Sequence, residues 1–167
     1  MLAKINTDRL TLDLVTINDH AFMRELVNSK GWLEFIGDRK VHSIEDAVAY
    51  IEKIRNTPNF FYWVVREKDT NTPVGIISFL KRVYLEHFDI GFAFLPAWQG
   101  KGYAYEAANE VLSVAKQLPE YPVILATTIP GNVDSIRLLK KLGLFFFKEI
   151  EVEKTNLHIY STAVTNG

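Results

Sequence analysis

One continuous stretch, from Phe88 to Ala107, constrains the fold more than any other part of the sequence. Its residues predict a buried strand, a Pro-Ala-Trp corner, a glycine-bearing loop and the first turn of a helix, in that order. The free backbone N–H groups at a helix start, together with the helix dipole, attract anions. The sequence therefore predicts a phosphate-binding site where the strand passes into the helix.

The loop within this stretch reads Gln99-Gly-Lys-Gly102-Tyr-Ala104. Small residues at Gly100, Gly102 and Ala104 would let a diphosphate approach the backbone closely, and Lys101 would add a positive charge. The loop lacks the spacing and the Lys-Ser/Thr pair of a nucleotide P-loop, and it also lacks the G-x-G-x-x-G dinucleotide fingerprint. The alternative, with equal weight, is that the loop is an ordinary glycine-containing helix start without a ligand and that Lys101 is simply solvated.

A second motif, Pro130-Gly-Asn132-Val-Asp-Ser135, opens a later helix. Asn132 is a suitable N-cap for that helix, because its side-chain oxygen can accept a hydrogen bond from the backbone of the first turn. The alternative is that Asn132 reaches a ligand lying between the two helix starts. The residues by themselves leave both interpretations open.

The pattern along the chain predicts one α+β domain with a mixed sheet over residues 1–167, because runs of antiparallel strands are interrupted by helices. Apolar runs and alternation predict strands at residues 10–15, 60–66, 73–80, 88–95, 123–128, 145–153 and 157–163. Helical spacing and capping signatures predict helices over residues 16–29, 43–55, 102–117 and 132–143. Residues 32–38 are expected to form an apolar loop or a short helical turn.

Composition narrows the classes of function. A net charge of −1 without a basic block argues against nucleic acid as a partner. No cysteine is present, so neither a disulfide nor a thiol nucleophile is available, which fits a cytoplasmic location. The first residues lack the apolar core of a signal peptide, and no apolar run could span a bilayer, so we expect no membrane partner. His20, His42, His87 and His158 lack metal-ligand spacing, and we expect no metal.

Read jointly, the motifs resemble a known family. The order strand, Gln-x-x-Gly-x-Ala, helix, strand, Asn-x-x-Ser, amphipathic helix, Lys141-Leu-Gly143-Leu144 is similar to the GNAT superfamily of acyl-CoA-dependent N-acetyltransferases. The resemblance covers nearly the whole chain, including residues 7–12 and the strand that leads into Trp98. It looks most like the branch that includes ribosomal-protein N-terminal acetyltransferases.

The resemblance implies a fold and a reaction. The fold would be a single α+β GNAT domain, with a mixed, mostly antiparallel sheet of about six or seven strands flanked by about four helices. The enzyme would move an acetyl group from acetyl-CoA to a primary amine, on a small molecule or a protein N-terminus, by direct attack in a ternary complex. The alternative is a non-catalytic acyl-CoA-binding module. The final hairpin, residues 145–163, is where a homodimer contact could form.

The resemblance also implies how the cofactor would bind. The strand ending at Leu95 would splay from the 123–128 strand, and the pantetheine arm would lie in the opening against backbone groups of residues 92–95. Amides of residues 100–104 would hold the pyrophosphate, with Asn132 and Ser135 beside the pantetheine. The expected cofactor-binding residues are Phe92, Phe94, Leu95, Gln99, Gly100, Lys101, Gly102, Tyr103, Ala104, Asn132 and Ser135.

The proton donor for the leaving thiolate departs from the family pattern. Many relatives place a Tyr near the middle of the last helix, where this chain has Leu138 and Leu139. Ser135, Tyr105 or water would then have to supply the proton.

The acceptor amine must lose a proton before it can attack, so a base is needed. Asp89 ranks first among the candidates, because a carboxylate on an inner strand lies near a strand end or is functional. Glu106 ranks second, although an acid in the first turn of a helix also suits the dipole. His87 ranks third, since a lone His at a strand start is more often a surface residue.

The acceptor pocket should be walled by aromatic residues of the N-terminal half. The candidates are Trp32, Phe35, Phe60, Phe61 and Tyr62. Most of the aromatic residues in the 60–65 stretch are expected in the core, so Trp32 and Phe35, in the apolar loop, are the expected substrate-binding residues. Glu34 and Asp38 could receive a cationic amine, or they could simply be solvated loop acids.

Overall fold

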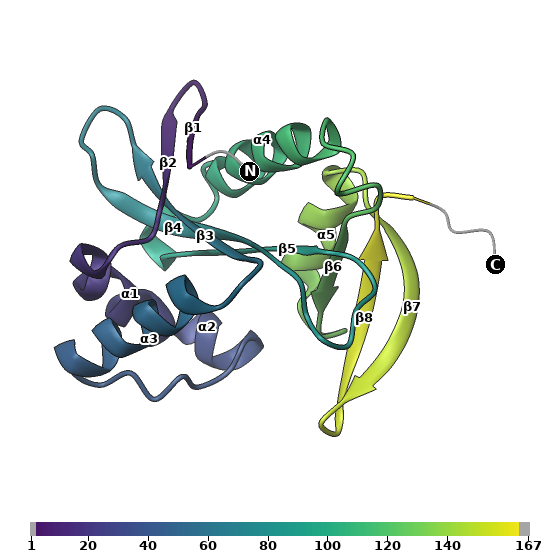
Figure 1. Cartoon of the computed structure of the whole chain (residues 1–167), viewed down its shortest axis with the longest axis horizontal. Coiled ribbons are helices and arrows are strands. Elements are labelled where there is room, and N and C mark those ends of the chain that lie inside the picture. Colours follow the sequence, from purple (N-terminus) through teal and green to yellow (C-terminus); the bar gives the residue numbers. More distant parts are fainter. Residues whose placement is uncertain (1–2, 164–167) are drawn as a thin grey trace.

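The computed structural model describes residues 3–163. These residues form one eight-stranded sheet in the order β1-β2-β3-β4-β5-β6-β8-β7 (Figure 1). The strands are β1 (Lys4–Asn6), β2 (Leu10–Leu14), β3 (Phe60–Glu67), β4 (Pro73–Leu80), β5 (Asp89–Phe94), β6 (Leu125–Thr128), β7 (Phe145–Val152) and β8 (Thr155–Ser161). The α-helices are α1 (His20–Val27), α2 (Lys30–Phe35), α3 (Ile44–Asn56), α4 (Tyr103–Lys116) and α5 (Val133–Lys141).

The expected fold class is confirmed, and the differences from the expectation are local. Among the described residues the sheet has one strand more than the upper estimate, because the short β1 pairs with β2. Three residues are too few to carry a periodic signal. For residues 32–38 the sequence left open an apolar loop or a short helical turn. The structure has a short helix there, α2, which spans Lys30–Phe35. The predicted domain range of 1–167 extends past the described residues and stays a prediction at both ends.

The sheet opens between β5 and β6. Among the described strands these two are the one parallel pair, and their register holds a single pair of Cα partners, Asp89 and Leu125. The Leu125 N–H donates to the Phe88 carbonyl at 2.9 Å, and beyond this point the strands separate. Figure 1 shows the consequence, with β1–β4 on the left, β5 running across the middle, and β6, β8 and β7 on the right. The expected splay is therefore present.

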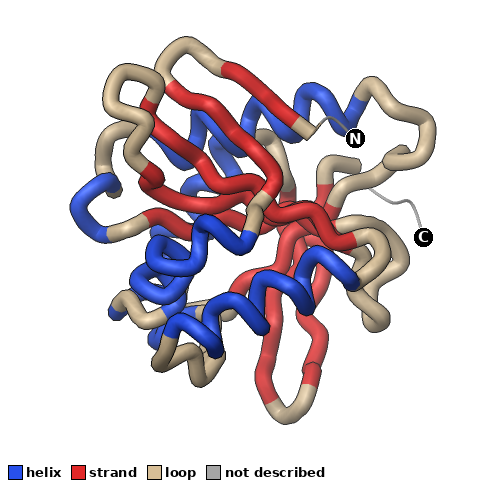
Figure 2. The backbone as a smooth tube through the Cα atoms, turned by 60° about the vertical axis from the view of Figure 1, so that its left-hand side comes forward, coloured by secondary structure: helices blue, strands red, loops and turns tan. Residues whose placement is uncertain are grey.

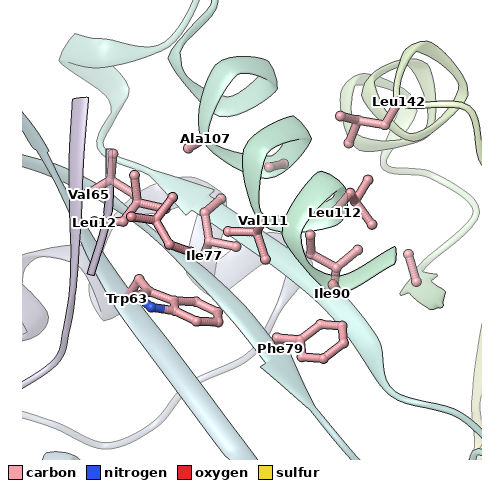
Figure 3. Close-up of a cluster of buried hydrophobic side chains, with 14 of the residues drawn as sticks. Leu12, Trp63, Val65, Ile77, Phe79, Ile90, Ala107, Val111, Leu112 and Leu142 are labelled. Carbon is pink, nitrogen blue, oxygen red and sulfur yellow. The ribbon is translucent and has the colours of Figure 1, made fainter. Parts of the chain in front are cut away.

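Helices cover both faces of the sheet, as Figure 2 shows. On one face α4 packs Ala107, Val111 and Leu112 onto strand side chains that include Ile77 and Ile90 (Figure 3). Each fully buried aliphatic side chain of this kind contributes about 1.5–3 kcal/mol to folding. On the other face α1, α2 and α3 bury their apolar stripes against residues of β3 and β4. Adjacent residues of β5 consequently point into two different layers.

In the described part of the chain, no helix combines the length and the apolar character that crossing a membrane would require.

Candidate active site

A cavity of about 880 Å³ occupies the opening between β5 and β6. It runs from α2 and the end of β4, past β5, to the N-terminal ends of α4 and α5. This volume lies within the usual range for small-molecule sites. Of the predicted site residues, those that line the cavity are Trp32, Phe35, Asp89, Phe92, Phe94, Gln99, Gly100, Gly102, Tyr103, Ala104, Asn132 and Ser135.

The start of α4 provides the anion-binding geometry at one end of the cavity. Gly100 and Gly102 have φ of +77° and +80°, a left-handed conformation that glycine adopts without steric cost. Gly102 is the N-cap, and no side chain caps the helix. The N–H groups of the first turn, which have no partner within a helix, are therefore left for a ligand. Since a Cβ at Gly100 would meet no atom within 4 Å, its conformation rather than crowding requires glycine there.

The backbone of β5 offers hydrogen-bonding groups to the same opening. In antiparallel pairing, alternate residues bond to the neighbouring strand. The Leu95 N–H donates to the Val74 carbonyl of β4 at 2.9 Å. The register of β4 with β5 therefore turns the backbone groups of Phe92 and Phe94 toward the side where β6 departs. On that side the Phe94 carbonyl accepts from Gln99 Nε2 at 3.0 Å, whereas its N–H lies on the open edge.

Asp89 lies at the base of the opening, where β5 and β6 meet. Its carboxylate is 2 % exposed, and both its oxygens accept from Arg82 Nε, at 3.1 and 3.2 Å. Burial raises the pKa of Asp89, and the Arg82 guanidinium offsets part of this rise. Burial acts most strongly on the pKa of Arg82 and lowers it, but Asp89, Tyr84 and Tyr62 together outweigh burial and raise that pKa. The pairing with Arg82 thus offsets part of the cost of burying the Asp89 carboxylate.

The far end of the cavity has aromatic walls and cationic side chains. Trp32 is 4 % exposed and lies under the Arg39 guanidinium, 5.8 Å from its ring centroid. Tyr62 of β3 also lines this end. Burial raises the pKa of Tyr62, and the Tyr50 side chain adds to the rise.

The sequence matches the family model for the acetyltransferase (GNAT) domain over residues 9–144, which is more than half of the chain. The chain belongs to the GNAT acetyltransferase family. It is therefore an acetyltransferase.

Relatives of this GNAT chain agree with that assignment. It is 31% identical over 148 residues to the uncharacterized N-acetyltransferase YnaD of Bacillus subtilis (strain 168), covering 87% of this chain and 86% of YnaD. A GNAT-family acetyltransferase from Bacillus anthracis has a TM-score of 0.79 at 24% identity, over 95% of this chain and 96% of that one. RimL, a ribosomal L7/L12 α-N-protein acetyltransferase in complex with coenzyme A, has a TM-score of 0.81 at 13% identity, over 95% and 96%. Ribosomal-protein acetyltransferases are thus among its neighbours in fold.

Three of the predicted GNAT site residues have backbone or side-chain positions that differ from the expectation. Leu95 does not line the cavity, because its N–H bonds to β4 and its carbonyl accepts from the Trp98 N–H at 2.9 Å. The Lys101 ammonium lies over the Trp98 ring, 5.4 Å from its centroid, and this side chain is also outside the lining. The Lys101 carbonyl accepts from Arg9 Nη1 at 3.0 Å.

Glu106 is the third correction, because the structure gives it a structural role. It accepts from the backbone N–H and Nε of Arg9, at 3.0 and 2.7 Å, and from the Thr7 hydroxyl. Burial acts to raise the pKa of Glu106, but the hydrogen bonds from Thr7 and Arg9 outweigh it and lower that pKa. Its hydrogen bonds to Thr7 and Arg9 anchor the β1–β2 turn to α4, and Glu106 is not part of the cavity lining, which argues against Glu106 as the base.

The other acidic and basic candidates, His87, Glu34 and Asp38, lie outside the cavity lining. His87 lies between β4 and β5, outside the cavity lining. Glu34 and Asp38 are exposed and do not line the cavity, and Asp38 Oδ1 accepts from the Lys40 N–H at 2.7 Å. These two are the solvated loop acids of the alternative interpretation.

At the start of α5, Asn132 caps the helix and also faces the cavity, so both interpretations of the 130–135 motif apply. Asn132 Oδ1 accepts from the Ser135 N–H at 3.3 Å, so Asn132 is the N-cap. Both residues also line the cavity, which leaves the Asn132 amide N–H groups and the Ser135 hydroxyl for a ligand. Tyr105 lines it as well, with Lys141 Nζ 4.4 Å from its ring centroid. Leu138 lies in the lining at the place where many relatives carry a Tyr.

Sequence reasoning missed the three arginines of the lining, Arg39, Arg82 and Arg137. Arg82 follows β4 by two residues and carries no local pattern, so only its pairing with Asp89 reveals it. Within residues 3–163 no group of three or more His, Cys, Asp and Glu side chains could hold a metal ion.

Proposed function

We propose that this protein binds acetyl-CoA in the cavity and transfers the acetyl group to a primary amine by direct attack in a ternary complex. The observation that carries the proposal is the continuous cavity, which joins an uncapped helix start to a buried carboxylate through the opening between β5 and β6. Bound acetyl-CoA would supply the activated acetyl group as a thioester.

The residues of the opening fit the extended shape of that cosubstrate. We propose that Gly100, Gly102, Tyr103 and Ala104 hold its diphosphate through their N–H groups. Phe92 and Phe94 would bind its pantetheine arm like an added strand, with Asn132 on the opposite side. The Phe94 N–H would donate to the acetyl carbonyl oxygen, which gains negative charge during the reaction.

Asp89 is our proposed base. It is the buried carboxylate of the lining, and burial raises its pKa, which makes it a better proton acceptor. The ammonium of the acceptor gives one proton to Asp89, and its nitrogen then forms the C–N bond as the C–S bond breaks. The second N–H proton passes to the sulfur by way of Ser135 or Tyr105, which gives the acetylated amine and a free thiol. Holding both reactants in one cavity contributes much of the rate.

Thiol release from acetyl-CoA, measured with a panel of amines and peptides, tests the proposal. We expect release that depends on the amine, with a product heavier by one acetyl group in mass spectrometry. Tight acetyl-CoA binding without release across the panel would instead support the non-catalytic binding module.

The diphosphate site has its own test, which is the pair of variants Gly102→Glu and Gly143→Glu. Both glycines have positive φ, +80° and +92°, so both substitutions add similar backbone strain. Only Gly102 lines the cavity, and only there would a carboxylate meet the diphosphate. Coenzyme A affinity should be lost in Gly102→Glu alone.

The remaining partners and the location stay predictions. The acceptor is a small-molecule amine or a protein N-terminus, and a cytoplasmic site of action agrees with the cysteine-free sequence. The edge strand β7 exposes Phe145, Phe146 and Phe147, so a homodimer would use this surface. Light scattering coupled to size-exclusion chromatography tests the dimer.

A further inference from the structure

The end of the cavity beside α2 and β4, which we call the acceptor end, has a surplus of positive charge, and this does not suit an acceptor whose only charge is an ammonium group. The charged residues that line this end, beside α2 and β4, are Arg39, Arg82 and Asp89. Because Arg82 and Asp89 neutralise one another, the guanidinium of Arg39 remains as the uncompensated charge. A second acid would be expected if the acceptor were a polyamine, and Glu34 and Asp38, the two nearby in sequence, lie outside the lining.

Arg39 is available to a ligand. Its side chain is exposed at the rim of the cavity, and no carboxylate of residues 3–163 lies within the 4.0 Å of a salt bridge. Its packing over the Trp32 ring, at 5.8 Å from the centroid, holds the guanidinium beside the aromatic wall. The guanidinium groups of Arg39 and Arg82 both act on Tyr62, lowering its pKa against the larger effect of burial. Arg39, Arg82 and Tyr62 all line the cavity.

The walls between these charges are apolar. Trp32, Phe35 and Ile36 come from α2 and its C-cap, and Tyr62 comes from β3. Such walls favour a hydrophobic or aromatic body over a polar chain.

Resting on the proposed function, we propose that the acceptor is a primary amine with an apolar or aromatic body that carries a carboxylate, with its amine directed to Asp89 and its carboxylate to Arg39. Arg39 is then the specificity-determining residue of the acceptor site. Polyamines are disfavoured because the second ammonium would lie against like charge. A protein N-terminus lacks a carboxylate at this position unless an acidic side chain follows it.

The test uses the full chain saturated with coenzyme A, with acceptor binding measured by calorimetry. The probes are 4-(aminomethyl)benzoate and benzylamine, and 6-aminohexanoate and pentylamine, two pairs that differ by one carboxylate at the end of the apolar body away from the amine. Spermidine is the polyamine probe. We expect each amino acid to bind about two- to fivefold more tightly than its partner amine, the effect of one exposed ion pair. Turnover with acetyl-CoA should show the same order.

Three variants assign the preference to Arg39. Arg39→Gln should remove the difference within each pair, and Arg39→Lys should keep part of it because the charge remains. Arg24→Gln removes an exposed arginine outside the cavity and should leave the difference unchanged.

The outcomes separate this inference from the proposed function. Equal binding within both pairs, tighter binding of the plain amines or of spermidine, or a preference that survives Arg39→Gln would overturn the inference. If amines with and without a carboxylate are acetylated equally well, the inference is overturned and the proposed function stands. If no amine in the panel releases thiol, the proposed function fails, and the calorimetric difference still decides the role of Arg39.

Discussion

Replacing Asp89 by Asn tests the proposed base, because the substitution keeps the shape of the side chain and removes its charge. General base catalysis contributes roughly 100-fold to 10,000-fold to a rate. We therefore expect kcat to fall by about 100-fold or more in Asp89→Asn. The dissociation constant for coenzyme A should stay within about threefold, since Asp89 lies on the acceptor side of the opening and is not among the groups proposed to bind the cofactor.

The same substitution also affects stability, and the structure sets the magnitude. Asp89 is 2 % exposed and Arg82 is 34 % exposed, so the pair is only partly shielded from water. Losing a charged hydrogen bond costs about 1.5–3 kcal/mol, and Asn both retains one acceptor for Arg82 and removes a buried charge. We expect the free energy of unfolding to fall by about 1–2 kcal/mol, which corresponds to a decrease in Tm of about 2–8 °C.

Asp19→Asn is the matched control. Asp19 is 7 % exposed and pairs with Arg66, whose side chain is 20 % exposed, and neither residue lines the cavity. The control should lose a similar amount of stability with unchanged kcat. If Asp89→Asn keeps kcat within about threefold of the wild type, or if Asp19→Asn loses as much activity, Asp89 is not the base.

The pH dependence gives an independent check on Asp89. Because burial raises its pKa, kcat should rise with pH through a value above the ordinary carboxyl pKa of about 4. In Asp89→Asn, kcat should not show this rise with pH. The folded-state pKa is the higher one, so the stabilising contribution of Asp89 is fully present below its unfolded pKa and is lost as pH rises through its folded pKa. Chemical denaturation across this window should show that decrease in the wild type and not in the variant.

Three further predictions address the remaining residues. Gly102→Glu should weaken coenzyme A binding by more than about tenfold in calorimetry, while Gly143→Glu stays near the wild-type value. Glu106→Gln should lower the free energy of unfolding in urea by about 1 kcal/mol with kcat unchanged, since its partner Arg9 is 47 % exposed; a large loss of kcat would return Glu106 to the catalytic candidates. Ser135→Ala should reduce kcat by about tenfold or more at constant acetyl-CoA affinity, and if Tyr105→Phe does so instead, Tyr105 is the proton donor.

The parts of the site that the sequence predicted well are local. The positive φ of Gly100 and Gly102, the cap at Asn132 and the strand before them depend on residues a few positions apart. Their signals are therefore readable in a single stretch. The resemblance to the GNAT family then related the two helix starts to one cosubstrate.

The parts of the site that the sequence did not reveal depend on partners far along the chain. Glu106 is a suitable first-turn acid by sequence, but Thr7 and Arg9, some 97–99 residues away, take up its carboxylate. Leu95 belongs to the expected strand, yet the register with Val74 decides which of its backbone groups stay free. Side-chain direction and strand register are set by pairing across the sheet, which no local window contains.

The stretch from Phe88 to Ala107, by itself, predicted a strand, a glycine-bearing loop and a helix start suited to an anion, because strand alternation and helix capping are properties of neighbouring residues. Only the tertiary structure decided what lies at the other end of the opening. The meeting of Asp89 with Arg82, and of Arg39 with Trp32, depends on how α2, β4 and β5 pack together. The residues proposed to bind the cofactor are thus recognisable from local sequence, whereas those proposed to bind the acceptor are brought together only by packing.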